Sequence, residues 1–403
     1  METFMENRAG NGNSKKVRRT SHRKSENASI SERFVMWLNP VKGKPDYIFL
    51  GTVILLIAYG IIMLFSASTA KAFGTYNDAT YFVKRQFVGI VLGAIGMFIC
   101  SNIDYHRYTG KVIGLFYGAV AVLLLLVVVG LGTTVNGATR WLFGFQPSEL
   151  AKVAIILIFA YNLSRQSGQK ELKNFKKGFV PYLILLLIYV GLLALEPHFS
   201  CIILIGLTAV IMLYVAGTPI KNFLYIAIPA VAGIVLMILL EPYRMARITT
   251  FANPFADMRG SGWQVVQSLY AIGSGGIFGV GLGQSRQKFQ SLPEPHNDFI
   301  FSVLGEELGL VGAILLIALF VILLIRGIKI ASKAPDLFGT LLVVGFVGIV
   351  VLQAIINIAV VTASIPNTGM PLPFFSYGNT ALSITMTEMG IVLNVSKQTR
   401  LFL

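Results

Sequence analysis

The sequence is poor in charged residues and in cysteine, and both shortages limit what the protein can be. Asp, Glu, Lys and Arg make up 13% of its 403 residues, whereas 55% of the residues are hydrophobic. A soluble domain usually carries about 25% charged residues, so this composition argues against one. Cys100 and Cys201 both lie in apolar runs, where inert packing is expected rather than a disulfide or a set of metal ligands.

The sequence also lacks the patterns that common cofactors require. None of the four histidines belongs to a His-Glu-x-x-His sequence, which is the spacing of many zinc sites. The glycine-rich segment 273–283 lacks the Gly-Lys-Ser/Thr ending of a phosphate-binding loop. We therefore expect no nucleotide there, and we interpret its glycines as a flexible loop or as close packing of re-entrant backbone.

Long apolar runs are what the sequence has instead. Crossing a bilayer takes about 17–25 residues in a helix, whereas the strands of a transmembrane barrel would be short and alternating. The sequence therefore predicts an all-α, polytopic integral membrane protein with a single membrane domain over 47–396. The ten expected spans are 47–67, 87–103, 112–131, 149–163, 179–195, 201–217, 223–240, 299–325, 340–363 and 380–396.

Positive charge predicts how these spans are oriented. The net charge of +15 would suggest nucleic acid in a soluble protein, but most Lys and Arg residues fall in segments on one side of the ten spans. The positive-inside rule makes that side cytoplasmic, so we expect no nucleic-acid partner. Residues 1–46 are then a disordered, basic cytoplasmic tail without the apolar core of a signal peptide. Residues 397–403 form a second cytoplasmic tail, and the loop 241–298 lies outside.

The loop 241–298 is the only long polar segment between apolar runs, so chemistry on a large polar substrate is expected there. Asp298 lies where this loop meets the eighth span. A carboxylate near lipid usually faces a cavity or a partner, although favourable charge at a helix N-terminus would also explain it. His296 lies two residues earlier and has a better claim to the site than His198, for which a hydrogen-bonded structural role is expected. The cations considered in this loop are Arg244, Arg247, Arg286 and Lys288.

Other polar groups lie at the ends of the spans. Glu149 and Lys152 are three residues apart on one helical face and can neutralise each other, so a structural ion pair is favoured over a catalytic role. Arg140 suits a phosphate or a lipid head group, and Trp141 an interfacial anchor. The uncharged loop 365–379, which contains Ser376, is either a packing element or the wall of a groove for lipid or sugar.

At these motifs the sequence resembles the SEDS family (shape, elongation, division and sporulation), in particular its FtsW and SpoVE branch, and it is also similar to RodA. The resemblance runs over almost all of residues 46–396. The motifs that carry it are Asn136-Gly137-Ala138-x-Arg140-Trp141, Gln146-Pro147-Ser148-Glu149-Leu150-Ala151-Lys152, Tyr243-Arg244-Met245-x-Arg247, Gly283-x-Ser285-Arg286-Gln287-Lys288, Leu292-Pro293-Glu294-Pro295-His296-x-Asp298-Phe299-Ile300-Phe301, Gly305-Glu306-Glu307, and Pro371-Leu372-Pro373-Phe374-x-Ser376-Tyr377-Gly378.

The resemblance implies a ten-span peptidoglycan glycosyltransferase in the bacterial cytoplasmic membrane. It would polymerise lipid II, an undecaprenyl-pyrophosphate-linked disaccharide peptide, on the outer face, for division or sporulation septum synthesis. A class B penicillin-binding protein transpeptidase and other division proteins are the implied partners. By matching positions, Asp298 would be the essential acidic residue, and Glu149 and Lys152 the paired residues of the fourth span. The residues expected to bind substrate are Arg140, Trp141, Arg244, Arg247, Arg286, Lys288, His296 and Ser376.

The sequence departs from the family pattern at two places. His198 and Ser200 stand in the turn after the fifth span where Asp and Gly are common, and Asn379 stands where a second Gly often follows Tyr-Gly. These departures put a direct role of that turn in doubt, though not the family assignment.

The implied reaction needs only one carboxylate. Asp298 would act as general base on the 4-hydroxyl of the acceptor sugar, and attack from the opposite face would invert the linkage from α to β. A pyrophosphate leaves as an anion, so its charge needs Arg, Lys or a divalent cation rather than a proton. The alternative functions are a flippase or transporter for the same lipid, which buried charges suit equally well, and a scaffold of the division machinery.

Overall fold

The computed structural model describes residues 43–135, 138–165, 170–239, 242–257, 260, 262–290 and 292–399. The predicted tails fall almost wholly outside these residues, so their boundaries stay predictions. Within the described residues, ten long helices correspond to the ten predicted spans. They are α3 (Tyr47–Tyr76), α4 (Tyr81–Asn102), α5 (Gly110–Leu126), α6 (Pro147–Ser164), α8 (Val180–Leu195), α9 (Phe199–Val215), α10 (Ile220–Leu239), α14 (Ile300–Ser332), α15 (Leu337–Val361) and α16 (Asn379–Lys397).

Seven helical segments among the described residues are long and apolar enough to cross a membrane, and α9 is apolar but shorter. Two of these segments include a short π-helical turn, η3 (Val127–Leu131) after α5 and η4 (Phe175–Phe179) before α8.

Some helices continue beyond the apolar run that predicted them, because a helix ends at a cap rather than where hydropathy falls. Thus α3 runs on to Tyr76 and ends at Asn77, which adopts a left-handed conformation with a φ of 52°.

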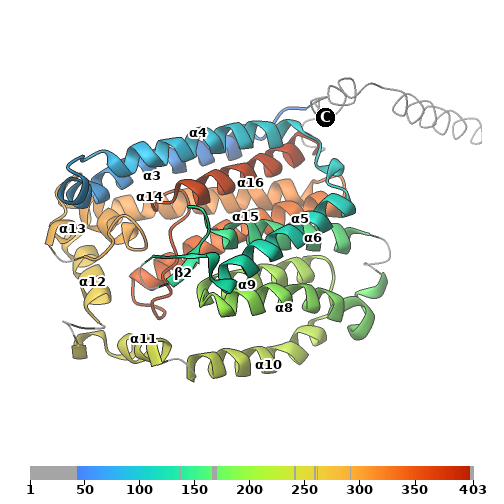
Figure 1. Ribbon diagram of the computed structural model, residues 1–403. Helices are drawn as coiled ribbons and strands as arrows, with labels where there is room; N and C mark the ends of the chain where they lie inside the picture. Colours follow the sequence, from blue (N-terminus) through green and yellow to red (C-terminus); the bar gives the residue numbers. More distant parts are fainter. Residues whose placement is uncertain are drawn as a thin grey trace, which may run out of the picture.

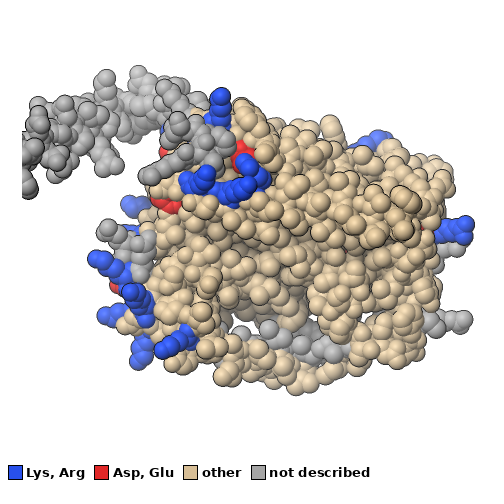
Figure 2. All heavy atoms as spheres, turned by 180° about the vertical axis from the view of Figure 1, so that it is seen from behind, with Lys and Arg blue, Asp and Glu red and all other residues tan. Residues whose placement is uncertain are grey.

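The long helices pack side by side in a bundle, with α6 and α15 inside it (Figure 1). The helix α16 packs against α4, and α14 packs against α15 and α3. Many large apolar side chains instead face outward, such as Leu115 and Ile228. Figure 2 shows a broad belt of surface without charged side chains, and Lys and Arg gather towards its ends. An apolar belt of this kind is what lipid contact requires, so the protein is a helical membrane protein.

The polar segment 241–298 is largely helical rather than an extended loop. It contains α11 (Pro242–Ala252), the 3-10 turn η5 (Pro254–Asp257), α12 (Trp263–Gly275) and the short α13 (Gln287–Gln290). In Figure 1, α11 lies beside α10 at the edge of the bundle, and α12 and α13 lie over one end of it.

The backbone of the glycine-rich segment 273–283 is closely packed. This agrees with the second of the two interpretations of the sequence, which were a flexible loop and close backbone packing. It pairs with α14 where that helix is interrupted at Gly309, whose φ is 62°. The amides of Val280 and Gly281 donate to the carbonyls of Glu306 and Glu307 at 2.9 and 3.0 Å. A Cβ atom on Gly275 would lie 1.9 Å from the carbonyl oxygen of Gly305, so no larger residue fits there.

A buried ion pair fixes the next part of the segment. The ammonium of Lys288 lies 2.6 Å from the carboxylate of Glu307, and both side chains are almost fully buried. Ser66 of α3 donates to the same carboxylate, and the hydroxyl of Ser285 donates to Glu306 at 2.5 Å. These contacts join α3, α13 and α14 at the end of the bundle where α14 begins.

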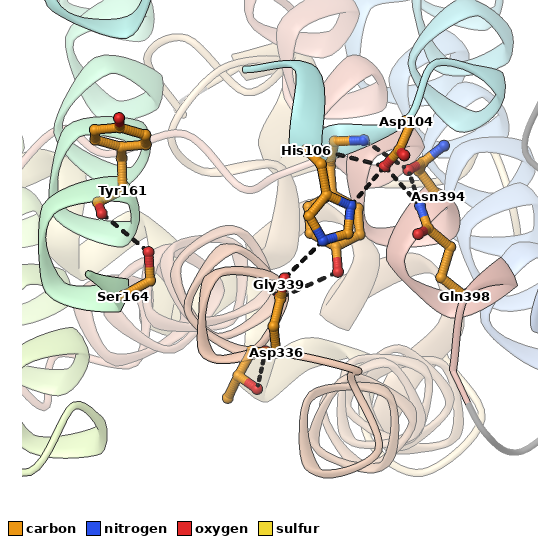
Figure 3. Close-up of polar contacts among 10 residues, drawn as sticks. Asp104, His106, Tyr161, Ser164, Asp336, Gly339, Asn394 and Gln398 are labelled. Carbon is orange, nitrogen blue, oxygen red and sulfur yellow. Dashed lines mark hydrogen bonds and ion pairs between the residues drawn. The ribbon is translucent and has the colours of Figure 1, made fainter. Parts of the chain in front are cut away.

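The opposite end of the bundle is held by a polar cluster that we call the His106 clasp, formed by Asp104, His106, Asp336 and Gln398 (Figure 3). The ring of His106 lies between two carboxylates, with Nδ1 2.8 Å from Asp104 and Nε2 2.6 Å from Asp336. The amide of Gln398 donates to Asp104 at 3.0 Å. The clasp thereby connects the α4–α5 turn, the α14–α15 turn and the end of α16.

Candidate active site

Asp298 lies two residues before α14, at the end of the bundle opposite the His106 clasp. Asn357 of the inner helix α15 fixes its backbone, because the side-chain amide donates to the carbonyl of Asp298 at 2.8 Å and to that of Met370 at 2.7 Å. Gly369 lies beside the carboxylate, and a Cβ atom there would be 3.4 Å from Oδ2 of Asp298. The uncharged loop after α15 therefore folds directly over Asp298.

The same loop is also hydrogen-bonded to the two residues that precede Asp298. The hydroxyl of Ser376 donates to the carbonyl of Asn297 at 2.7 Å and accepts from the amide of Leu372. The amide of Tyr377 donates to the carbonyl of His296 at 2.9 Å. The loop is thus a packing element that also forms a wall of the site. The hydroxyl of Ser376 holds backbone in place, and its predicted contact with substrate stays a prediction.

Two arginines supply positive charge near Asp298. Burial raises the pKa of Asp298 to about 6, and the charges of Arg247 and Arg140 oppose this shift. Arg247 on α11 donates to the carbonyl of Asn367 at 2.7 Å. Arg140 on the strand β2 (Ala138–Trp141), which pairs antiparallel with β1 (Thr133–Val135), donates to the carbonyl of Pro197. A carboxylate that titrates near neutral pH beside two cations suits general-base catalysis with an anionic leaving group.

His296 forms another side of the site. Its ring packs against Phe82 with centroids 4.3 Å apart, and Nε2 lies 3.6 Å from Glu294. Burial lowers the pKa of His296 to about 4, so the ring is neutral at pH 7. Glu294 in turn pairs with Lys71 at the end of α3. Lys71 lies far from the polar segment in the sequence, and no sequence pattern predicted that it would pair with Glu294.

The ion pair of the fourth span is present and buried. Lys152 lies 2.7 Å from Glu149, and its ammonium donates to Gln353 of α15 at 3.2 Å. Gln353 donates in turn to the carbonyl of Pro371 at 2.9 Å, in the loop over Asp298. The pair is therefore linked through one side chain to the wall of the site. Glu388 of α16 interacts electrostatically with Lys152, and the sequence patterns gave no sign of it.

The structure does not bring every predicted residue to Asp298. Lys288 is paired with Glu307, and Arg286 is exposed with its backbone amide bonded to Glu306 at 2.8 Å. Trp141 lies on the same hairpin as Arg140. The side chain of Arg244 lies outside the described part of the chain, so its predicted role stays a prediction. Among the described residues, no group of three or more His, Cys, Asp or Glu side chains has the arrangement of a metal site.

Known proteins resemble this chain over nearly its whole length. A family model described as cell cycle protein, FTSW_RODA_SPOVE, matches residues 46–401. The chain is 40% identical to the probable peptidoglycan glycosyltransferase FtsW of Geobacter sp. (strain M18), over 88% of this chain and 97% of the relative. It is 41% identical to stage V sporulation protein E of Bacillus subtilis, over 89% of this chain and 99% of that protein.

Solved structures agree with these sequence comparisons. A chain from a structure titled "Structural coordination of polymerization and crosslinking by a peptidoglycan synthase complex" superposes with a TM-score of 0.73 and 28% identity, over 89% of this chain and 99% of that one. The rod shape determining protein RodA of Thermus thermophilus superposes with a TM-score of 0.62 and 28% identity, over 88% and 98% of the two chains.

Proposed function

The chain belongs to the FtsW, RodA and SpoVE family of cell cycle proteins and is a peptidoglycan glycosyltransferase of division or sporulation, and we propose that it polymerises lipid II with Asp298 as the general base. One observation carries the assignment of the base. Asp298 is a partly buried carboxylate at one end of the bundle that interacts electrostatically with two arginines, and its pKa is raised to about 6. It is therefore mostly ionised at pH 7 and still basic enough to accept a proton.

The proposed reaction follows from this geometry. Asp298 accepts the proton of the acceptor hydroxyl while the hydroxyl oxygen forms a bond to the anomeric carbon of the donor. The bond from that carbon to the lipid pyrophosphate breaks, and the pyrophosphate takes the electron pair. Arg247 and Arg140 are the cations placed to stabilise its charge. One carboxylate is sufficient because this leaving group needs no proton.

The orientation in the membrane is part of the proposal. The positive-inside rule supports cytoplasmic termini and puts the Asp298 end outside, at the bacterial cytoplasmic membrane. Cysteines introduced at the exposed positions Arg286 and Lys173 test it in a Cys100→Ser background. A membrane-impermeant maleimide added to intact cells should label the first and spare the second, and the opposite pattern would refute the orientation.

A crosslinking partner is also proposed. The related structure of a peptidoglycan synthase complex joins polymerisation to crosslinking in its title. A class B penicillin-binding protein transpeptidase is the partner that would crosslink strands made by this chain. Co-purification of the two proteins from detergent-solubilised membranes tests this part independently of catalysis.

The catalytic proposal is tested with purified protein and lipid II, with the products sized on a gel. The wild-type protein should make glycan strands, and Asp298→Asn should make none. Asp78→Asn is the matched control, because Asp78 follows α3 at the same end of the bundle and pairs with exposed Lys84. Lipid II transport into vesicles without polymer would instead support a flippase, and neither activity would support a scaffold.

A further inference from the structure

We propose that Glu196 and His198, on the turn between α8 and α9, form a subsite beside Asp298 that binds uncharged hydroxyl and amide groups of a substrate sugar. The subsite rests on the glycosyltransferase function proposed above. Both residues lie in the turn that follows Leu195 and precedes α9. Ser200, at the start of α9, donates to the carbonyl of Thr368 in the loop over Asp298, so the turn lies at the Asp298 end of the bundle.

The first observation is a buried carboxyl group without a protein partner. Glu196 is 2% exposed, and neither of its carboxyl oxygens has a hydrogen-bond partner among the described residues. Buried polar groups in folded proteins are nearly always hydrogen-bonded, so an exception needs an explanation. A group that is satisfied only when substrate is bound is one such explanation.

Other unpartnered polar atoms lie around the same turn. Within the described part of the chain, they are Nδ1 of His198 and the hydroxyls of Ser148 and Thr368. The hydroxyl of Ser200 donates to the carbonyl of Thr368, and Sγ of Cys201 lies 3.9 Å from the carbonyl of Ser148. The start of α6, the α8–α9 turn and the loop over Asp298 therefore bring these atoms to one place.

Arg140 connects this place to the catalytic carboxylate. Its guanidinium donates to the carbonyl of Pro197 within the turn. It also interacts electrostatically with Glu196, His198 and Asp298. One cation thus interacts with both carboxyl groups, so a ligand held at the turn would lie close to Asp298.

The charge state of the turn indicates which ligand fits. Burial raises the pKa of Glu196 to about 8, against the opposing charge of Arg140. Burial, with Arg140 and Lys152, lowers the pKa of His198 to about 3. At pH 7 the turn therefore offers a neutral carboxylic acid and a neutral imidazole, which donate and accept hydrogen bonds without net charge. Sugar hydroxyls and acetamides match this chemistry, whereas pyrophosphate is an anion and requires positively charged partners.

The test measures binding to full-length protein in nanodiscs, in an Asp298→Asn background that prevents turnover. The two probes are lipid II and undecaprenyl pyrophosphate, which has the same pyrophosphate and no sugar. Glu196→Met should weaken lipid II binding at least 10-fold and leave undecaprenyl pyrophosphate binding unchanged. Glu196→Gln, which keeps hydrogen-bonding capacity, should restore part of the loss. Glu171→Met is the matched control, because Glu171 is exposed near the far end of α8.

Two results would overturn the subsite. Unchanged lipid II binding in Glu196→Met would show that the turn does not contact sugar. An equal loss of both probes in Glu196→Gln would show that the buried cluster only supports the fold. Neither result affects the proposed function, which fails only if purified wild-type protein makes no glycan from lipid II.

Discussion

The histidines at the two ends of the helix bundle lie in opposite environments. In the His106 clasp both ring nitrogens face carboxylates, and these partners raise the pKa of His106 to about 9 (Figure 3). At the Asp298 end, Nδ1 of His296 and of His198 has no partner among the described residues, and burial lowers both pKa values. The paired ring of His106 stabilises the fold. The unpaired ring nitrogens of His296 and His198 do not, so the rest of the structure must hold these side chains in place.

This contrast separates structural polar clusters from candidate sites more clearly than charge content does. Both ends are rich in titratable residues, but among the described residues of the two ends, the carboxyl groups whose pKa values are raised by desolvation, Glu196 and Asp298, lie at the Asp298 end. Perturbed groups of this kind gather at functional sites, because catalysis and binding use what folding leaves unpaired. Removing one of these unpaired groups should therefore change activity or binding without unfolding the protein, and removing one member of a buried pair should lower stability.

The largest effect is expected at Asp298. The substitution Asp298→Asn removes basicity and should lower the polymerisation rate by about 10²–10⁴-fold, the usual contribution of a general base. Thermal melting above pH 6 should stay unchanged or rise, because a buried charge is removed. Polymerisation assays and melting of the same preparation check both parts. If the melting temperature of Asp298→Asn falls so far that unfolding accounts for the lost activity, Asp298 is a structural residue like those of the clasp.

Lys152→Ala should lower stability rather than act on catalysis directly, although Lys152 is linked through Gln353 to the wall of the site. The substitution leaves Glu149 as an unpaired buried charge with Glu388 nearby. Breaking a buried pair costs about 3–5 kcal/mol, so the melting temperature should fall. The double variant Glu149→Gln/Lys152→Met removes both charges and should regain much of the loss. A wild-type melting temperature in Lys152→Ala would show that the pair does not stabilise the bundle.

Glu196 should make stability depend on pH. Its folded pKa of about 8 lies above the ordinary value of 4.5, so the folded state holds the proton more tightly than the unfolded state. Stability should therefore fall as pH rises from about 4.5 to 8 and level off above that. Glu196→Gln should flatten this fall, because a neutral amide cannot ionise as the pH rises. A shift of one pKa unit corresponds to about 1.4 kcal/mol, so the fall that the variant removes should amount to a few kcal/mol. Melting curves across this range, with Glu171→Gln as control, would contradict the assignment if both variants kept the wild-type slope.

The smallest effect is expected at the clasp. The folded pKa of His106 is raised from 6.5 to about 9, so its contribution is complete below pH 6.5 and is lost as pH rises through 9. The ring is partly exposed, and exposed ion pairs contribute about 0.2–1 kcal/mol. His106→Gln should therefore lower stability by roughly 1 kcal/mol at pH 6 and by less at pH 10, without changing the polymerisation rate. A change in the polymerisation rate of His106→Gln at constant stability would contradict the purely structural role of the clasp.

The amino-acid sequence by itself determined the membrane helices and the place of Asp298. Hydropathy is a property of about 20 consecutive residues, so each run predicted its own helix. The glycines at 273–283 left a flexible loop and close backbone packing open, and the structure shows the close packing. The position of Asp298 before the eighth span needed no knowledge of its neighbours.

Only the tertiary structure decided which charges meet. Four cations of the polar segment looked alike in the sequence, yet Lys288 is paired with Glu307 while Arg247 lies near Asp298. Arg140 joins the site from a hairpin far away in the chain, and Glu196 gave no signal because an isolated Glu after an apolar run is ordinary. Pairing depends on contacts between segments more than 100 residues apart, such as Arg247 with Asn367. No local pattern encodes such contacts, because the free energy of a buried charge is set by what the fold places around it.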